Sequence, residues 1–267
     1  MFMKSFLFSA VALAAVAPLT AQETAAPAPA TVATVANPAA DAVVKHVSAL
    51  LDGSWKSTFA VQVLEGEKKT ADVTVGVQFL DVKHFQLDIA MSTEDEFEGA
   101  VSQTFTVVAD GTYLYVNSPD MAKMTGGMMS GPVKIELAFA EKMIGSQAKV
   151  DINDGGALKG LAAEMIGKMS LKEEGSVEGK RRFIVEQEGV SGFMVFDAKS
   201  WFLDSAEVSA EGSLTKISVS DSGKVSEWPE GSFTFTAAEG VVVTDLTSMI
   251  KAQMGPMEEE SDEDLEF

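Results

Sequence analysis

The feature that most constrains this chain is an alternation of apolar residues with polar or small ones, which returns in segment after segment. Turn signals such as Asp110-Gly111 separate the segments. A period of two places successive side chains on opposite faces of a strand, and many such strands joined by short turns form an antiparallel meander. The predicted strands are residues 59–63, 73–79, 85–91, 101–107, 112–117, 181–187, 192–197, 202–209, 214–220 and 233–243.

Helical patterns occupy the stretches before, between and after these strands. Asp41 is a suitable N-cap for a helix over residues 41–51, because valines and leucines then recur at helical spacing. Residues 135–144 and 158–169 are further helical candidates, and a short amphipathic stretch covers residues 246–254. The sequence therefore predicts an N-terminal helix and a helical insertion between two groups of strands.

These patterns predict a mainly β chain of the α+β class. One curved antiparallel sheet could hold residues 41–255 as a single domain, and two segregated sheets are the alternative. Residues 22–40 are rich in Ala, Pro and Thr without apolar periodicity, which predicts a flexible leader. Residues 256–267 are strongly acidic and predict a disordered tail, with calcium or partner binding as the alternative.

The N-terminus has the parts of a secretory signal peptide. Lys4 supplies a positive charge, residues 6–17 are apolar, and small residues suit cleavage after Ala21. The apolar run is shorter than the roughly 20 residues that a membrane-spanning helix needs. We therefore expect residues 1–21 to be removed and the mature protein to be soluble outside the cytoplasm, without lipidation of its own, since no Cys follows the cleavage point.

The composition excludes several classes of protein. The chain has no Cys, so it can form no disulfide, zinc ribbon, iron–sulfur cluster or cysteine nucleophile. Its 40 Asp and Glu against 20 Lys and Arg leave a formal net charge of −20. Such a charge argues against a nucleic-acid partner, because neutralising phosphates requires a basic face.

Candidate catalytic groups are few and isolated. His46 and His84 are the only imidazoles, and neither has a serine or acidic partner at a telling spacing, so both are predicted to be surface or capping residues. Residues 151–156 look like the start of a calcium loop, but Gly155 and Ala162 stand where carboxylates are needed. We expect no enzyme activity, metal or cofactor, and a hydrolase that uses two of the many carboxylates is the alternative.

A cluster of methionines marks the segments that interrupt the sheet, where glycines at 126, 127 and 131 would allow movement. Methionine is unbranched and polarisable, so it can line a surface that accepts irregular apolar shapes. Ordinary core filling is the alternative for each of them taken singly. The predicted lid residues are Met121, Met124, Met128, Met129, Leu161, Met165 and Met169.

The sheet needs a cover, because one face of a wide antiparallel sheet must be shielded from water. Short helices broken by glycine seal such a face poorly, so it either packs shut as core or leaves a concave apolar cavity. A lipid acyl chain buried in that cavity would gain roughly 0.8 kcal/mol per methylene. The predicted lining residues are Val75, Val77, Phe79, Phe85, Leu87, Ile89, Met91, Phe105 and Val107.

Two short motifs resemble those of a known family, the LolA-type outer-membrane lipoprotein carriers and their lipid-binding relatives. The motifs are a hairpin at residues 105–119 (FTVVADGTYLYVNSP) and a C-terminal stretch at residues 233–243 (FTFTAAEGVVV). The order of an N-terminal helix followed by residues 55–91 is similar to the family's opening elements as well.

The chain departs from the family pattern at two points. Asp81-Val82-Lys83 stands where the family has Lys-Arg-Pro before its third strand, which removes the arginine that ties the family's lid to its sheet. Ala237 and Ala238 replace the two prolines of the C-terminal motif. The fold therefore transfers from the family more safely than the function does.

The resemblance implies a strongly curved, unclosed antiparallel sheet, a half-barrel, with helices as a lid over a hydrophobic cavity. It also implies a periplasmic, monomeric carrier and chaperone that binds acyl chains of lipoproteins or lipids and moves them toward the outer membrane. Inner- and outer-membrane transport proteins would be its partners. A non-enzymatic envelope sensor, or regulatory binding module, on the same scaffold is the alternative.

Overall fold

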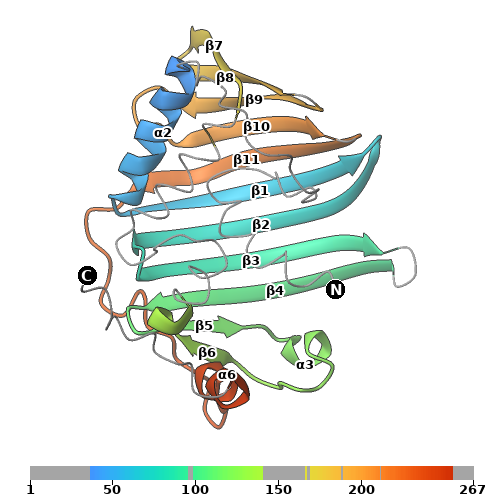
Figure 1. Ribbon diagram of the computed structural model, residues 1–267, viewed down its shortest axis with the longest axis vertical. Helices are drawn as coiled ribbons and strands as arrows, with labels where there is room; N and C mark the ends of the chain where they lie inside the picture. The colour runs from blue at the N-terminus through green and yellow to red at the C-terminus, as the bar shows by residue number, and fades with distance from the viewer. Residues whose placement is uncertain are drawn as a thin grey trace, which may run out of the picture.

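A single sheet of 12 strands organises the protein. The computed structural model describes residues 37–95, 99–140, 166, 169–187, 189–210 and 212–254. The strands are β1 (Trp55–Glu65), β2 (Lys68–Asp81), β3 (His84–Asp95), β4 (Gly99–Asp110), β5 (Tyr113–Asn117), β6 (Val133–Glu136), β7 (Leu171–Val177), β8 (Lys180–Gln187), β9 (Val190–Asp197), β10 (Leu203–Ala210), β11 (Ser213–Lys224) and β12 (Thr244–Asp245). Their order across the sheet is β12-β6-β5-β4-β3-β2-β1-β11-β10-β9-β8-β7 (Figure 1).

The strand order divides the sheet into two meanders. Strands β1 to β6 follow one another from the middle of the sheet toward one end. Strands β7 to β11 follow one another from the other end back to the middle. The meanders meet where β1 pairs antiparallel with β11, and the short β12 adds a parallel pair beside β6. The sheet is therefore open, with β12 and β7 at its two ends, which confirms the unclosed antiparallel sheet and excludes two segregated sheets.

The N-terminal helix α2 (Pro38–Leu51) begins earlier than the sequence pattern predicts. Asn37 is its N-cap, and the Asn37 side chain accepts a hydrogen bond of 3.2 Å from the backbone nitrogen of Ala40. Pro38 follows at the first helical position, where the missing N–H costs nothing. The prediction of Asp41 as the cap was wrong, because Asp41 already lies in the first turn.

Two further helices lie at the other end of the sheet (Figure 1). The helix α3 (Met121–Met124) is a single turn after β5, and α6 (Leu246–Met254) follows β12. The amphipathic stretch predicted at residues 246–254 is thus confirmed as a helix. None of the helices in the described ranges is long and apolar enough to cross a membrane.

Tight turns connect the central strands, and the side chain of His84 packs between two of these turns. The carboxylate of Asp81 accepts hydrogen bonds from the backbone nitrogens of Lys83 and His84, and its oxygen lies 2.9 Å from Nδ1 of His84. In the turn between β4 and β5, Gly111 has a φ of +91°, and a Cβ at this position would lie 2.6 Å from Nε2 of His84. A glycine is required there for both its backbone conformation and its lack of a side chain.

One predicted element began too early and another was wrong. The helix predicted over residues 135–144 is present at residues 137–140, but Val133–Glu136 forms β6 against β5, and residues 141–144 lie outside the described ranges. Residues 233–243 were expected to form a strand, but they contribute no strand to the sheet. Instead Phe233 packs against Trp228, with ring centroids 5.3 Å apart, and Phe235 stacks on Tyr115 at 4.8 Å.

Several predictions fall outside the described residues. These are the signal peptide at residues 1–21, most of the leader at 22–40, the calcium-like residues 151–156 and the acidic tail at 256–267. The predicted helix at residues 158–169 is described only at positions 166 and 169.

Candidate functional site

The strand register defines one apolar surface of the sheet, here called the inner face. Residues paired directly across antiparallel strands have side chains on the same face. Val77 of β2 pairs with Leu87 of β3, which pairs in turn with Val107 of β4. The pairs on either side continue the pattern, and Met91 pairs with Val73. All the predicted lining residues therefore lie on this inner face: Val75, Val77, Phe79, Phe85, Leu87, Ile89, Met91, Phe105 and Val107.

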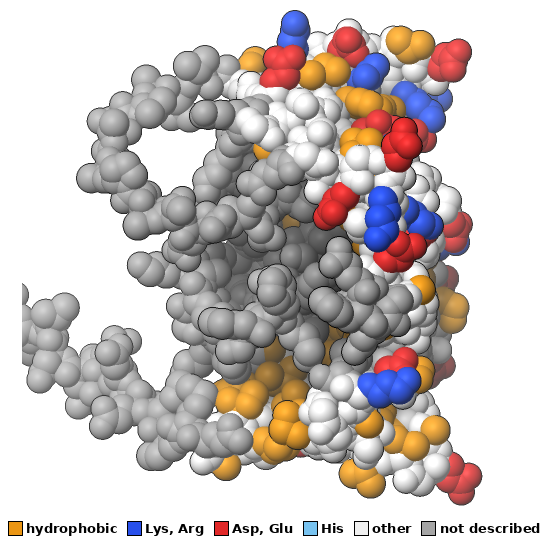
Figure 2. All heavy atoms as spheres, turned by 90° about the vertical axis from the view of Figure 1, so that its right-hand side faces the viewer, with side chains coloured by type: hydrophobic (Ala, Val, Ile, Leu, Met, Phe, Trp, Pro, Cys, Tyr) orange, Lys and Arg blue, Asp and Glu red, His pale blue; other side chains and the backbone are white. Residues whose placement is uncertain are grey.

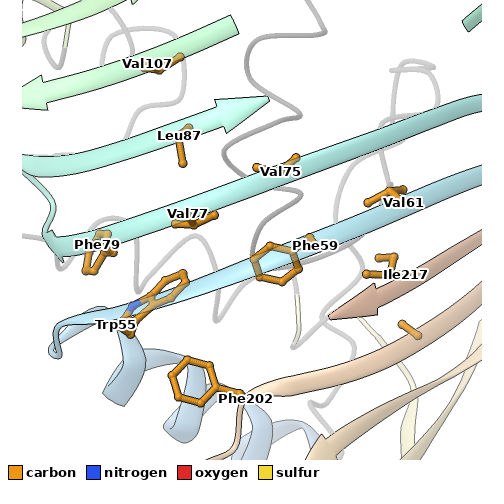
Figure 3. Close-up of a cluster of buried hydrophobic side chains, with 11 residues drawn as sticks. Trp55, Phe59, Val61, Val75, Val77, Phe79, Leu87, Val107, Phe202 and Ile217 are labelled. Atoms are coloured by element: carbon orange, nitrogen blue, oxygen red, sulfur yellow. The ribbon is translucent and has the colours of Figure 1, made fainter. Parts of the chain in front are cut away.

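The inner face continues across the junction of the two meanders. Val61 of β1 pairs with Ile217 of β11, which pairs with Ala206 of β10. Ala206 pairs with Met194 of β9, and Met194 pairs with Phe183 of β8. One row of apolar side chains thus runs from Met91 of β3, through Val73 of β2 and Val61 of β1, to Phe183 of β8 (Figure 3 shows its central part).

Sequence reasoning missed part of this surface. Trp55, Phe59, Val61, Phe202 and Ile217 belong to the same buried cluster as the predicted lining residues. Phe59, Val61 and Ile217 lie within predicted strands, so extending the alternation across every strand would have found them. Trp55 precedes the first predicted strand and Phe202 lies at the very start of another, where the period of two carries little signal.

Burial varies along the inner face. Val75, Val77 and Leu87 are buried in the centre. Phe85 and Ile89 pack against the buried cluster, and Phe105 is paired with Ile89. All three side chains keep part of their surface exposed. The inner face thus combines an apolar floor with apolar side chains that remain partly accessible. The cavity above it stays a prediction.

A small polar group interrupts this apolar surface at the start of β1. The hydroxyl of Ser57 is buried and lies 2.5 Å from the hydroxyl of Ser222. Trp55, two residues earlier on the same face, stacks on Phe79 with ring centroids 5.5 Å apart and meets the edge of Phe202 at 6.1 Å. Among the described residues, Nε1 of Trp55 is the one buried side-chain nitrogen or oxygen that has no hydrogen-bond partner.

The predicted lid residues do not form one group. Met121 is buried in α3 and Met129 is half-buried, whereas Met128 is 83% exposed. The hydroxyl of Thr125 ties their loop together, since it accepts from the backbone nitrogen of Met129 and donates to the carbonyl of Met121. Met169 lies elsewhere, in the cluster beneath α2. Leu161, Met165 and the side chain of Met124 lie outside the described residues.

The helix α2 covers the inner face at the β7 end of the sheet, where Ala40 and Val43 pack into a second cluster with Phe183, Val185 and Phe196 (Figure 1). The ring of Phe183 is completely buried. This end of the inner face is therefore closed by the chain's own helix.

His46 of α2 is partly exposed, and its ring takes part in this closure. Its ring stacks on Trp201 with centroids 3.6 Å apart, and the guanidinium of Arg181 lies 4.2 Å from the Trp201 ring. Burial lowers the pKa of His46, and the positive charges of Lys45 and Arg181 lower it further. Glu173 accepts two hydrogen bonds of 2.7 Å from Arg181, which lower the pKa of the Glu173 carboxyl.

Charged side chains gather on the opposite, outer surface of the sheet (Figure 2). Lys56 pairs with Asp221 at 2.8 Å, and Lys180 pairs with Asp204 at 2.8 Å. Within the described ranges, no group of three His, Asp or Glu side chains is placed to hold a metal ion. The inner face itself presents mainly apolar side chains, some buried and some partly exposed.

Comparisons with known proteins show similarity to several solved structures. One is LprF from Mycobacterium bovis, at 14% identity over 73% of this chain and 97% of that one, with a TM-score of 0.39. Another is a LolA superfamily protein from Nitrosomonas europaea, at 13% identity over 74% of this chain and 99% of that one, with a TM-score of 0.30.

A third is a putative outer membrane lipoprotein-sorting protein domain from Vibrio parahaemolyticus, at 11% identity over 73% of this chain and 97% of that one, with a TM-score of 0.28. No protein-family model and no curated protein matches the sequence.

Proposed function

We propose that this protein is a non-enzymatic periplasmic carrier that binds acyl chains of lipoproteins or lipids on the inner face of its sheet. It moves them toward the outer membrane. The observation that carries the proposal is the apolar inner face, which extends from β4 to β8 across the junction of the meanders and stays partly exposed at Phe85, Ile89 and Phe105. Covering an accessible apolar surface of this kind with hydrocarbon is favourable, by roughly 25 cal/mol for each Å² of apolar area removed from water.

The outer surface supports the same assignment. Its ion pairs keep it hydrated, so an apolar ligand finds its favourable contact on the inner side only. The periplasmic location rests on the predicted signal peptide at residues 1–21, and the transport role rests on the motifs at residues 105–119 and 233–243.

Native mass spectrometry of gently purified protein tests the proposal directly. We expect bound lipid that survives transfer into the gas phase and is removed by organic extraction. A clean unliganded mass after several mild extraction procedures would contradict the proposal.

A matched pair of variants then locates the binding face. Ile89 and Ala90 are neighbours on β3, but Ile89 lies on the inner face and Ala90 on the outer one. Ile89→Gln should reduce the bound lipid, because a polar amide then lies in the apolar row. Ala90→Gln introduces the same side chain on the outer face and should leave the bound lipid unchanged. Equal loss in both variants would place binding elsewhere.

A further inference from the structure

Trp55 occupies a special position on the inner face. It is the first residue of β1, three residues beyond the turn-forming end of α2 at residues 51–52, and its pairing with Phe79 places its side chain on the inner face. The residue is only 9% exposed, and its ring packs between Phe79 and Phe202 (Figure 3). The indole therefore belongs to the wall that a bound apolar ligand would contact.

The indole N–H of Trp55 lacks an acceptor. An indole nitrogen can only donate, and a buried donor without a partner opposes folding. The hydroxyls closest to Trp55 in the chain are already engaged: Ser54 accepts a hydrogen bond of 2.6 Å from Nε1 of Trp228, and Ser57 lies 2.5 Å from Ser222. Each of these two hydroxyls already has a hydrogen-bond partner, whereas Nε1 of Trp55 has none in the described part of the chain, so an acceptor from outside the chain would satisfy it.

The surroundings of the indole define what that acceptor can be. Phe79 and Phe202 favour an apolar group on either side of the acceptor atom. A carboxylate would be costly there, because the nearest cation along the chain, Lys56, lies on the outer face and pairs with Asp221 at 2.8 Å. A neutral carbonyl oxygen attached to a hydrocarbon chain satisfies both conditions.

We infer that the indole N–H of Trp55 donates a hydrogen bond to the acyl carbonyl oxygen of the bound ligand. The ligand class is thereby narrowed to acyl esters and acyl amides, as opposed to hydrocarbons, ethers or free fatty acids. This inference rests on the proposed function, and it specifies where the polar end of the acyl chain is held.

A pair of ligands that differ only in the carbonyl tests the inference. The probes are a palmitoyl lysophosphatidylcholine, which has an ester, and its hexadecyl ether analogue, both used below their micelle concentration. The wild-type protein should bind the ester about three- to tenfold more tightly, which is the usual net effect of one hydrogen bond. Trp55→Phe should lose this preference, because it keeps the aromatic ring and removes the donor. Trp228→Phe also removes an indole N–H, but one that Ser54 already satisfies, and should keep the preference.

A spectroscopic measurement on the wild-type protein covers the case in which Trp55→Phe does not fold. The three tryptophans give three indole ¹H–¹⁵N signals, which backbone-linked NMR experiments assign. The Trp55 signal should move downfield with the ester ligand and much less with the ether, because only the carbonyl is a strong acceptor.

The outcomes separate the inference from the proposed function. Equal binding of ester and ether by the wild-type protein, or a Trp55 signal that the ester leaves in place, would overturn the inference while lipid binding itself stands. Failure of both ligands to bind would overturn the proposed function and the inference with it.

Discussion

The inner face of the sheet is covered differently in its two regions. Beneath α2 the ring of Phe183 is 0% exposed, and Trp201 contacts both His46 and Arg181. In the centre of the first meander, Phe85 and Ile89 lie on the same face with part of their surface exposed. One apolar surface is thus closed by a helix at the β7 end and left partly exposed in the centre of the first meander.

This difference shows that the strand pattern does not decide whether an apolar face becomes core or binding surface. Phe183 and Ile89 both lie in alternating runs, and the strands that carry them are similarly apolar. The helix packed above Phe183 makes the distinction. In the proposed function, the α2 end therefore stabilises the fold, and the centre binds the acyl chain.

The largest loss of stability should come from removing a buried side chain beneath α2. Phe183→Ala removes a fully buried ring and should lower the free energy of unfolding by about 3–5 kcal/mol, as measured by urea denaturation. Phe85→Ala, on the accessible part, is the matched change. It should cost less stability, because its ring is only partly buried, but should weaken lipid binding more. The reverse ranking would abolish the contrast between the two regions.

A smaller effect should follow from acidification of the same closed region. The pKa of His46 lies below its ordinary value of 6.5, so the folded state favours the neutral ring. Below pH 6.5 the unfolded chain binds more protons at this site, and the free energy of unfolding should fall as the pH drops toward the lowered pKa.

Urea denaturation at about pH 7.5 and about pH 5.5 measures this effect, and the carboxyls with lowered pKa titrate below that window. His46→Gln should show a weaker pH dependence than the wild-type protein, since His84 is unchanged in both. An identical pH dependence in the two proteins would show that the protonation of His46 does not contribute to the stability of the region beneath α2.

The smallest change in stability is expected at Met128, which lies outside both regions and is 83% exposed. Met128→Ser should alter the free energy of unfolding by less than about 0.5 kcal/mol. If this loop acts as the predicted lid, the same variant should release bound lipid faster, which stopped-flow transfer to vesicles would measure. Unchanged release would remove Met128 from the lid.

Most of the sheet was predictable from the sequence because its central strands alternate strictly. The edge strand β7 was missed, since only Leu171 is buried there and the other positions are exposed and polar. The error at residues 233–243 has the opposite origin. Phe233 and Phe235 alternate as in a strand, but they do so to pack on Trp228 and Tyr115. Alternation reports which side a residue faces, and it does not report hydrogen-bonded pairing.

That the predicted lining residues share one face was predictable for the same reason, whereas the unpaired nitrogen of Trp55 was not. Alternation places Val77 and Leu87 on one face without knowledge of which strands are neighbours. The nitrogen of Trp55 is unpaired in the folded chain, while its neighbour Ser54 accepts a hydrogen bond from Trp228, 174 positions further along. Relations of that kind arise only once the chain has folded.

The pairing of β1 with β11 also governs how this protein must assemble. Lys56 and Asp221, which meet across that pair, are separated by 165 positions, so an N-terminal portion synthesised before β11 has no partner for the free edge of β1. That edge exposes unpaired N–H and C=O groups until nearly the whole chain has arrived, and long-range closure of this kind is slow. The newborn polypeptide is therefore most vulnerable to aggregation at β1, and holding factors that shield this strand should raise its yield.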